Sequence, residues 1–299
     1  MLVPRTPGEF GRSEPGAGVR LEAVAIGLLW LVSRLLPVTW ASRLGGSLFA
    51  SFGPRSWKQR RILANLTRVL GSDDADVLLP LSRGVWRNLG AVLAEYPHLK
   101  MIRRERVELV LDPAVQAMVN AHQPLMVLAA HLGNWEVIVD CMNRLGLPVV
   151  VVNAAQKNPL LDRAIRYFRS AEPAQYVAKG DALRKLLRPA HANANLGVLL
   201  DQRADTGVML DLFGEPALTT IIPARIALRL QRPMVPVQAQ RLPGARFRVT
   251  FHAPLRNETA FADEKTAATA ATEQFQRLLE DWILEDPGQW LCTKRRWPV

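Results

Sequence analysis

The sequence predicts an α/β protein with a mixed, mostly parallel sheet flanked by helices and an apolar N-terminal helical segment that associates with a membrane. From Pro124 onward, short apolar runs alternate with stretches of helical periodicity, the pattern of a sheet covered on both faces. Before that point, residues 23–54 carry only two charges, Arg34 and Arg43. The chain has 299 residues, 49% of them hydrophobic, which is enough to bury a sizeable core.

The lengths of the apolar runs assign the individual elements. Five short runs are predicted as strands: Leu125–Ala130, Pro148–Asn153, Leu196–Asp201, Met234–Gln240 and Phe247–His252. Five longer stretches are predicted as helices: Trp135–Leu145, Pro159–Ser170, Asp181–His191, Ile222–Leu230 and Thr266–Glu285. Residues 62–99 are predicted as further helices with a break at 71–76. The chain is thereby divided into a disordered Pro- and Gly-rich tail (1–18), a membrane-associating helical segment (19–61) and an α/β domain (62–299).

The N-terminal segment admits three interpretations. Its longest uncharged run, Ala23–Ser33, has 11 residues, whereas a clean membrane span needs about 20, and Pro37 breaks or kinks any helix here. Tryptophans and a basic cluster accompany the apolar residues: Trp30, Trp40 and Trp57, then Arg55, Lys58, Arg60 and Arg61. This combination favours a segment lying in a membrane interface near anionic headgroups. A single span and a buried core helix are the alternatives.

The charge and the cysteines limit the classes of partner. A net charge of +11 favours anionic partners, which include nucleic acid, anionic lipid, phosphorylated substrates and acidic proteins. No nucleic-acid motif is present, so a nucleic-acid binder is not expected. The basic run Lys294–Arg296, with Trp290 and Trp297, is either a surface for headgroups or an acidic protein, or a solvated tail. Two cysteines without a CxxC pair indicate a reducing compartment, and the histidines lack metal-ligand spacing, so no metal is expected.

His131 directly follows the first predicted strand, and open α/β sheets carry their sites at such carboxyl ends. Gly133 permits a sharp turn and Asn134 is a good helix N-cap, so Glu136 in the next helix can return to the imidazole. A carboxylate on one ring nitrogen would let the other take a proton from a hydroxyl. The alternative is that His131 only caps the strand end.

Oxyanion donors for an acyl transfer are sought near the same turn. The candidates are backbone N–H groups at Gly133 and a cation from Arg166 or Arg169, although arginines on a basic helix are often a solvated face.

Polar residues elsewhere complete the predicted site. Asp201 and Gln202 end another strand, where they could orient an acceptor or hold an active-site arginine, or form structural pairs. Thr219 and Thr220 precede a predicted helix, where they could seat a phosphate or serve as plain N-caps.

The motif HLGNWE (131–136) resembles that of the bacterial lauroyl/myristoyl acyltransferases of lipid A biosynthesis, members of the lysophospholipid acyltransferase superfamily with its His-x4-Asp/Glu signature. The blocks KNPLLDRAIRYFR (157–169), 199–237 and PGQWLCTKRRW (287–297) resemble later blocks of that family. One departure is Asn153–Ala154, where the family typically has a tyrosine–arginine pair.

The resemblance implies transfer of a fatty acyl chain from acyl carrier protein or coenzyme A to a hydroxyl of a phosphorylated glycolipid, a lipid A precursor, at the cytoplasmic face of a bacterial inner membrane. No cofactor is implied. His131 would be the general base and Glu136 its orienting partner, with Asn158 among the substrate-binding residues. The alternatives are another acceptor, such as a phosphatidylinositol mannoside or a lysophospholipid, and an inactive lipid-binding relative.

Overall fold

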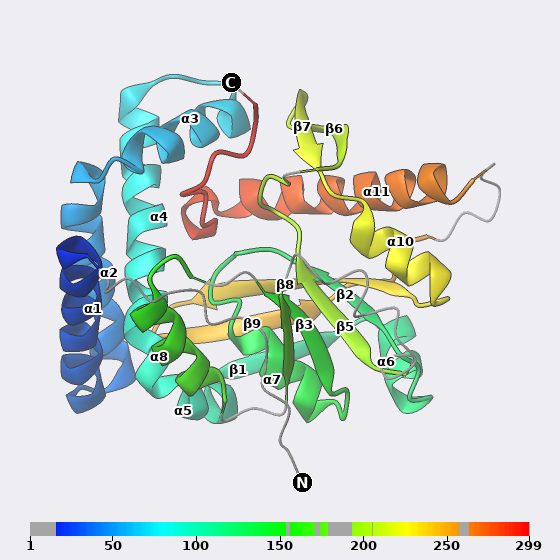
Figure 1. Cartoon of the computed structure of the whole chain (residues 1–299), viewed down its shortest axis with the longest axis horizontal. Helices are drawn as coiled ribbons and strands as arrows, with labels where there is room; N and C mark the ends of the chain where they lie inside the picture. Colours follow the sequence, from blue (N-terminus) through cyan, green and yellow to red (C-terminus); the bar gives the residue numbers. More distant parts are fainter. Residues whose placement is uncertain are drawn as a thin grey trace, which may run out of the picture.

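The computed structural model describes residues 16–153, 156–170, 174–178, 193–204, 206–256 and 263–298, and a seven-stranded sheet lies at its centre (Figure 1). In spatial order the strands are β1 (Val107–Leu111), β9 (Arg246–Phe251), β8 (Met234–Leu242), β2 (Met126–Ala129), β5 (Asn195–Leu199), β3 (Val149–Asn153) and β4 (Gln175–Ala178). A separate antiparallel hairpin is formed by β6 (Val208–Leu212) and β7 (Glu215–Thr219).

All neighbouring pairs in the large sheet are parallel except β8 and β9. These two strands are consecutive in the chain and joined by a tight turn, where Gly244 has a φ of 80° and Ala245 one of 55°. A connection this short can only join antiparallel strands. The predicted mixed, mostly parallel sheet is confirmed, and the strands β8, β2, β5, β3 and β4 end at one common edge.

Helices cover both faces of the sheet (Figure 1). On one face lie α5 (Leu99–Glu105), α6 (Pro113–Asn120) and α7 (Val137–Arg144), and on the other α10 (Ile222–Arg229) and α11 (Glu264–Glu285). The side chains of β2 alternate accordingly: Val127 and Ala129 pack with the first layer, Met126 and Leu128 with the second. Because β2 is buried on both faces, it is apolar throughout.

The N-terminal helices form a layer beside the sheet (Figure 1). They are α1 (Ala17–Leu35), α2 (Val38–Phe52), α3 (Gln59–Leu70) and α4 (Ala75–Glu95), with short 3₁₀ turns at Gly53–Arg55 and Tyr96–His98. Pro37 separates α1 from α2, as the sequence predicts. Helices α2 and α4 touch through glycines: a Cβ added to Gly45 would lie 2.4 Å from the carbonyl oxygen of Gly90. Among the described residues, no helix has both the length and the apolar character needed to cross a membrane.

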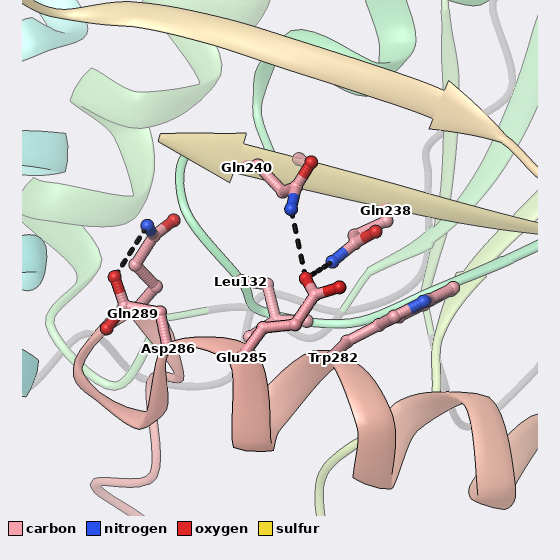
Figure 2. A pocket seen from close by; sticks show the side chains of 8 residues that line it. Leu132, Gln238, Gln240, Trp282, Glu285, Asp286 and Gln289 are labelled. Atoms are coloured by element: carbon pink, nitrogen blue, oxygen red, sulfur yellow. Dashed lines mark hydrogen bonds between the residues drawn. The ribbon is translucent and has the colours of Figure 1, made fainter. Parts of the chain in front are cut away.

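The end of α11 is tied to the sheet and borders a pocket of about 200 Å³ (Figure 2). Glu285 accepts hydrogen bonds from the side-chain amides of Gln238 (2.9 Å) and Gln240 (3.0 Å), both on β8. The pocket is lined by Leu132, Gln238, Ala239, Gln240, Trp282, Glu285, Asp286 and Gln289. The following 3₁₀ turn, Pro287–Gln289, leads into the C-terminal segment.

The predicted strands are all present with ends shifted by at most two residues, and so are four of the five predicted helices. The remaining helix, predicted at 181–191, lies outside the described residues, as do residues 1–15 of the predicted tail. One of the four confirmed helices is α8 (Pro159–Arg169). The sequence does not predict the edge strands β1 and β4 or the β6–β7 hairpin. In β1, half-buried residues alternate with exposed ones around a charged Glu108, so no continuous apolar run marks the strand.

Candidate active site

His131 and Asp201 meet at the carboxyl edge of the sheet because their strands are parallel neighbours. Ala129 of β2 is paired with Leu199 of β5, and each site residue follows two positions later. The imidazole Nδ1 lies 2.7 Å from the Asp201 Oδ1, which also accepts the backbone N–H of His131 at 3.1 Å. Two hydrogen bonds to one oxygen fix both the position and the orientation of the histidine.

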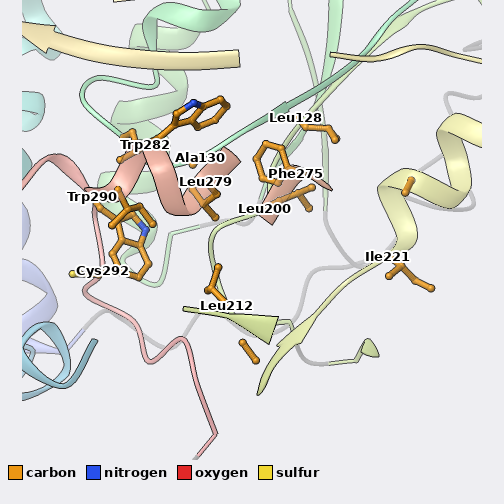
Figure 3. Close-up of a cluster of buried hydrophobic side chains, with 14 of the residues drawn as sticks. Leu128, Ala130, Leu200, Leu212, Ile221, Phe275, Leu279, Trp282, Trp290 and Cys292 are labelled. Carbon is orange, nitrogen blue, oxygen red and sulfur yellow. The ribbon is translucent and has the colours of Figure 1, made fainter. Parts of the chain in front are cut away.

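The carboxylate of Asp201 is buried and charged. Burial alone would raise its pKa, but the imidazole of His131 and hydrogen bonds from His131 and Trp290 outweigh that effect, so its pKa lies below the usual value. Trp290 donates its indole N–H to Oδ2 at 3.1 Å and packs in the core beside Cys292 and Leu279 (Figure 3). An ionised carboxylate selects the tautomer in which Nδ1 carries the proton and Nε2 carries the free lone pair.

In this structure Glu136, the predicted partner of the imidazole, is bound to other residues. Its Oε2 accepts the Nε–H of Arg169 at 2.9 Å, while Oε1 accepts the Tyr96 hydroxyl and the Trp135 indole N–H at 3.0 Å each. The turn through residues 132–135 therefore points Glu136 toward α8, and within this turn the Trp135 ring packs against the imidazole, at 5.0 Å between centroids. The sequence places the two residues five positions apart but does not show that Arg169 competes for the acid.

Glu136 and Arg169 form a buried ion pair that ties α8 to the turn after His131. Burial alone would raise the pKa of Glu136, but attraction and hydrogen bonding from Arg169 dominate and hold that pKa below its usual value. Tyr96, buried beside them, has a raised pKa, from burial first and from the charge of Glu136 second. Arg169 is thus bound to Glu136, so its predicted role as a cation that stabilises an oxyanion is not supported by its contacts.

We expect Arg169→Gln to destabilise the fold by about 3–5 kcal/mol, because it leaves a buried carboxylate without its cation. The matched control is Arg166→Gln on the same helix. The Arg166 side chain is 68% exposed in its pair with Asp162, against 12% for Arg169, so its removal should cost about 1 kcal/mol or less. Urea unfolding at pH 7 measures both free energies.

The same pair predicts a pH dependence. In the native protein the pKa of Glu136 is lowered, so its ionisation stabilises the fold above about pH 4.3, the ordinary value, and this contribution fades only as the pH falls through the lower folded pKa. Without Arg169, burial would instead raise that pKa. The Arg169→Gln variant should therefore recover part of its lost stability between pH 7 and pH 5, and equal losses at both values would contradict this account.

Gly133 and Asn134 shape the turn rather than face a substrate. Gly133 has a φ of 53°, and an added Cβ would lie 2.5 Å from the carbonyl oxygen of Ala239. Its N–H donates to the Gln289 carbonyl at 3.2 Å, so the predicted oxyanion role of this group is not supported. Asn134 is fully buried and donates to Glu95 at 2.8 Å.

Two predicted binding residues on α8 have structural partners. Asn158 is the N-cap of α8, accepting the N–H of Leu160 at 3.1 Å, and it donates to Glu22 of α1 at 2.9 Å. Arg166 pairs with Asp162 on the outer side of the helix. Neither contacts the His131–Asp201 pair in any described interaction, so the substrate-binding role predicted for them is not supported by their geometry.

The two threonines predicted to bind a phosphate are also hydrogen-bonded to other groups of the protein. Thr219 is buried; its hydroxyl donates to the Ala217 carbonyl and accepts from the Arg296 guanidinium at 2.7 Å. Burial lowers the pKa of Arg296 to about 10. Thr220 accepts the N–H of Ile222 at 3.3 Å, which is local capping of the helix start. The C-terminal basic run is therefore partly exposed and partly buried. Lys294 and Arg295 are exposed, whereas Arg296, Trp290 and Trp297 are core residues.

Gln202 is brought directly against the imidazole. Its amide nitrogen lies 3.4 Å from both ring nitrogens of His131, and its Oε1 accepts the Lys294 ammonium at 2.7 Å. The sequence identifies Gln202 by its strand-end position but gives Lys294 no place in the site. The pocket beside α11 is a separate feature, because its lining does not include His131. Within the described ranges, no group of three or more His, Cys, Asp and Glu side chains could hold a metal ion.

A histidine–carboxylate pair at the carboxyl edge of parallel strands is an arrangement that can support general base catalysis. The chain belongs to the bacterial lipid A biosynthesis acyltransferase family, which it matches over residues 20–298, so it is an acyltransferase. This confirms the resemblance seen in the motifs. A crystal structure of the 1-acyl-sn-glycerophosphate (LPA) acyltransferase PlsC from Thermotoga maritima is similar, at 15% identity over 81% of this chain and 97% of that chain, with a TM-score of 0.36. No curated protein matches the chain.

Proposed function

We propose that this acyltransferase moves a fatty acyl chain from a thioester of acyl carrier protein or coenzyme A to a hydroxyl of a phosphorylated glycolipid, a lipid A precursor. Membership of the family supports the acceptor class. The single observation that carries the mechanism is the 2.7 Å contact between His131 and a buried, ionised Asp201, which leaves Nε2 free as the base.

The reaction follows from that geometry. His131 Nε2 takes the proton of the acceptor hydroxyl as the hydroxyl oxygen attacks the thioester carbonyl carbon. The new C–O bond forms and the carbonyl electron pair moves onto oxygen. When that pair returns, the C–S bond breaks, and the departing thiolate takes the proton from the imidazolium. Asp201 stabilises the imidazolium throughout, and general base catalysis of this kind contributes about 10²–10⁴ in rate.

The donor and acceptor are tested with purified protein. The donors are an acyl carrier protein thioester and the matching acyl-CoA; the acceptors are a lipid A precursor, a phosphatidylinositol mannoside and lysophosphatidic acid. Mass spectrometry of the products should show one added acyl chain on the lipid A precursor with at least one donor. Acylation of only another acceptor would overturn the acceptor assignment, and no product on any acceptor with either donor would overturn the enzymatic proposal.

We also propose that α1 and α2 lie in the cytoplasmic interface of the inner membrane. Helix α1 is apolar on both sides: Ile26, Leu29 and Trp30 face the protein, whereas a second row is exposed, namely Leu21, Val24, Leu28, Leu31 and Leu35. Trp40, Phe52 and Trp57 in the following segment are exposed as well, and the guanidinium of Arg61 lies 4.3 Å from the Trp57 ring centroid. A large exposed apolar patch with aromatic and cationic residues fits an anionic lipid surface.

The membrane proposal predicts that Leu28→Glu/Leu31→Glu lowers binding to phosphatidylglycerol-containing vesicles at least tenfold. These side chains are 57% and 60% exposed, and burying a leucine contributes about 1.5–3 kcal/mol. The control is Leu284→Glu on α11, which is 51% exposed but lies outside the α1–α2 surface. Vesicle co-sedimentation measures the bound fraction, and equal losses for both variants would contradict a specific membrane face.

A further inference from the structure

We propose that Gln202 and Lys294 complete the active site: the Gln202 side-chain amide donates a hydrogen bond to the oxyanion, and Lys294 holds that amide in place. The inference rests on the proposed acyl transfer and deepens it. Lys294 has no role in the mechanism derived from His131 and Asp201 alone.

The position of Gln202 follows from the sheet. It is the residue after Asp201, beyond the carboxyl end of β5, so the same strand delivers the carboxylate to Nδ1 and the amide to the imidazole. Its Nε2 is equally distant, 3.4 Å, from the two ring nitrogens of His131, which places it over the ring rather than in the ring plane. The in-plane lone pair of the imidazole Nε2 is thereby left to the acceptor hydroxyl, while the amide lies beside the reacting carbonyl.

Lys294 determines which end of the amide faces the histidine. An ammonium can only donate, so its 2.7 Å contact with Oε1 assigns the carbonyl end of Gln202 to Lys294 and the N–H₂ end to His131. A cation on the amide oxygen also polarises the amide and makes its N–H a stronger donor. Both features are needed in a group that stabilises a developing negative charge.

The C-terminal segment holds Lys294 firmly at this point. Asn65 of α3 donates to the backbone carbonyls of Cys292 and Lys294, at 2.8 Å each. The N–H of Leu291 donates to the backbone carbonyl of His131 at 2.9 Å, and Trp290 binds Asp201. The backbone on both sides of Lys294 is therefore fixed against the site, so the ammonium reaches Gln202 from a preorganised position.

The other donors expected for this role are engaged elsewhere. The Gly133 N–H donates to the Gln289 carbonyl, Arg169 binds Glu136, and Arg166 pairs with Asp162. Among these candidates and Gln202, the amide of Gln202 is the one in contact with the catalytic imidazole.

During the reaction the amide donates without losing a proton. As the hydroxyl oxygen bonds to the thioester carbon, the carbonyl pair moves onto oxygen, and the Gln202 N–H₂ donates to that oxyanion. When the pair returns and the C–S bond breaks, the hydrogen bond weakens and the ester leaves. Gln202 is thus a catalytic residue that touches the reacting oxygen, and Lys294 is a positioning residue.

Steady-state kinetics with the native acceptor, a lipid A precursor, and an acyl carrier protein thioester test both assignments. Gln202→Leu should lower kcat about 10²–10³-fold with KM changed less than threefold, as expected for an oxyanion donor. Lys294→Met should lower kcat at least tenfold with the same unchanged KM, and Lys294→Arg, which keeps a cationic donor, should restore most of it. The control Arg277→Met removes an exposed cation on α11, outside the C-terminal basic run, and should leave kcat within twofold.

The outcomes separate this inference from the proposed function. Circular dichroism and thermal unfolding establish that each variant is folded before kinetics are compared. A kcat within twofold of the native value for Lys294→Met, or a rise in KM alone, would overturn the positioning role while leaving His131 catalysis intact. Equal losses in Lys294→Met and Lys294→Arg would also overturn it. Retained activity in His131→Ala would instead overturn the proposed function itself.

Discussion

His131→Ala is expected to lower kcat for acyl transfer by about 10³-fold, within the 10²–10⁴ that a positioned general base contributes. The variant leaves Asp201 with its Trp290 hydrogen bond and removes a side chain that is 19% exposed, so the fold should survive. Residual activity would come from binding and from the oxyanion donor. Kinetics of the purified variant against the native protein measure the loss, with thermal unfolding as the control for folding.

The same variant has an expected result in cells. In a strain lacking the native protein, one acyl chain should be missing from a membrane glycolipid, and the native protein but not His131→Ala should restore it. Mass spectrometry of extracted lipids reads this out directly. Full restoration by the variant would remove the general-base assignment.

Asp201→Asn has an expected effect of similar size, a fall in kcat of about 10²–10⁴-fold with KM changed by no more than a few fold. The asparagine keeps the shape but carries no charge to stabilise the imidazolium, and its amide can present N–H₂ instead of oxygen to Nδ1, which favours the wrong tautomer. Because the pKa of Asp201 is lowered, the native carboxylate stays ionised down to below about pH 3.9, its ordinary value. The deficit of the variant should therefore persist across pH 5–8.

Glu136→Gln supplies the discriminating comparison for Asp201→Asn. If Asp201 orients the imidazole, the Glu136 variant should lose activity only as far as its weakened link to Arg169 loosens the turn, about tenfold or less when folded. If folded Glu136→Gln loses as much kcat as Asp201→Asn, or more, then Glu136 and not Asp201 orients the imidazole.

The sequence predicts His131 correctly as a strand-end residue but not its partner. Asp201 is 70 positions away, and the partnership arises because β2 and β5 are parallel neighbours in register. Strand order is set by how the whole sheet packs, which no local pattern encodes. Glu136 is favoured by its short separation from His131, whereas Arg169, from another helix, decides where the acid points.

The fold is predicted best where its pattern is local. Central strands such as β2 and β8 contain uninterrupted apolar runs, at 126–129 and 234–237, so their positions follow from hydrophobicity. The edge strands β1 and β4 are half-exposed or short and carry a weak signal. The C-terminal run is misjudged for a different reason: Lys294 and Arg296 are two residues apart and chemically alike, yet one reaches the Gln202 amide and the other is buried on Thr219.

The hydrogen bond from Trp290 to Asp201 has a consequence for how the enzyme matures. His131 precedes Trp290 in the chain, so during synthesis the histidine emerges before the segment that anchors its carboxylate partner. Under the proposed mechanism, a nascent chain cannot begin acyl transfer until Trp290 and Lys294 have emerged from the ribosome and bound Asp201 and Gln202. A protein truncated before Trp290 should be inactive in the same assay even where the rest of it folds.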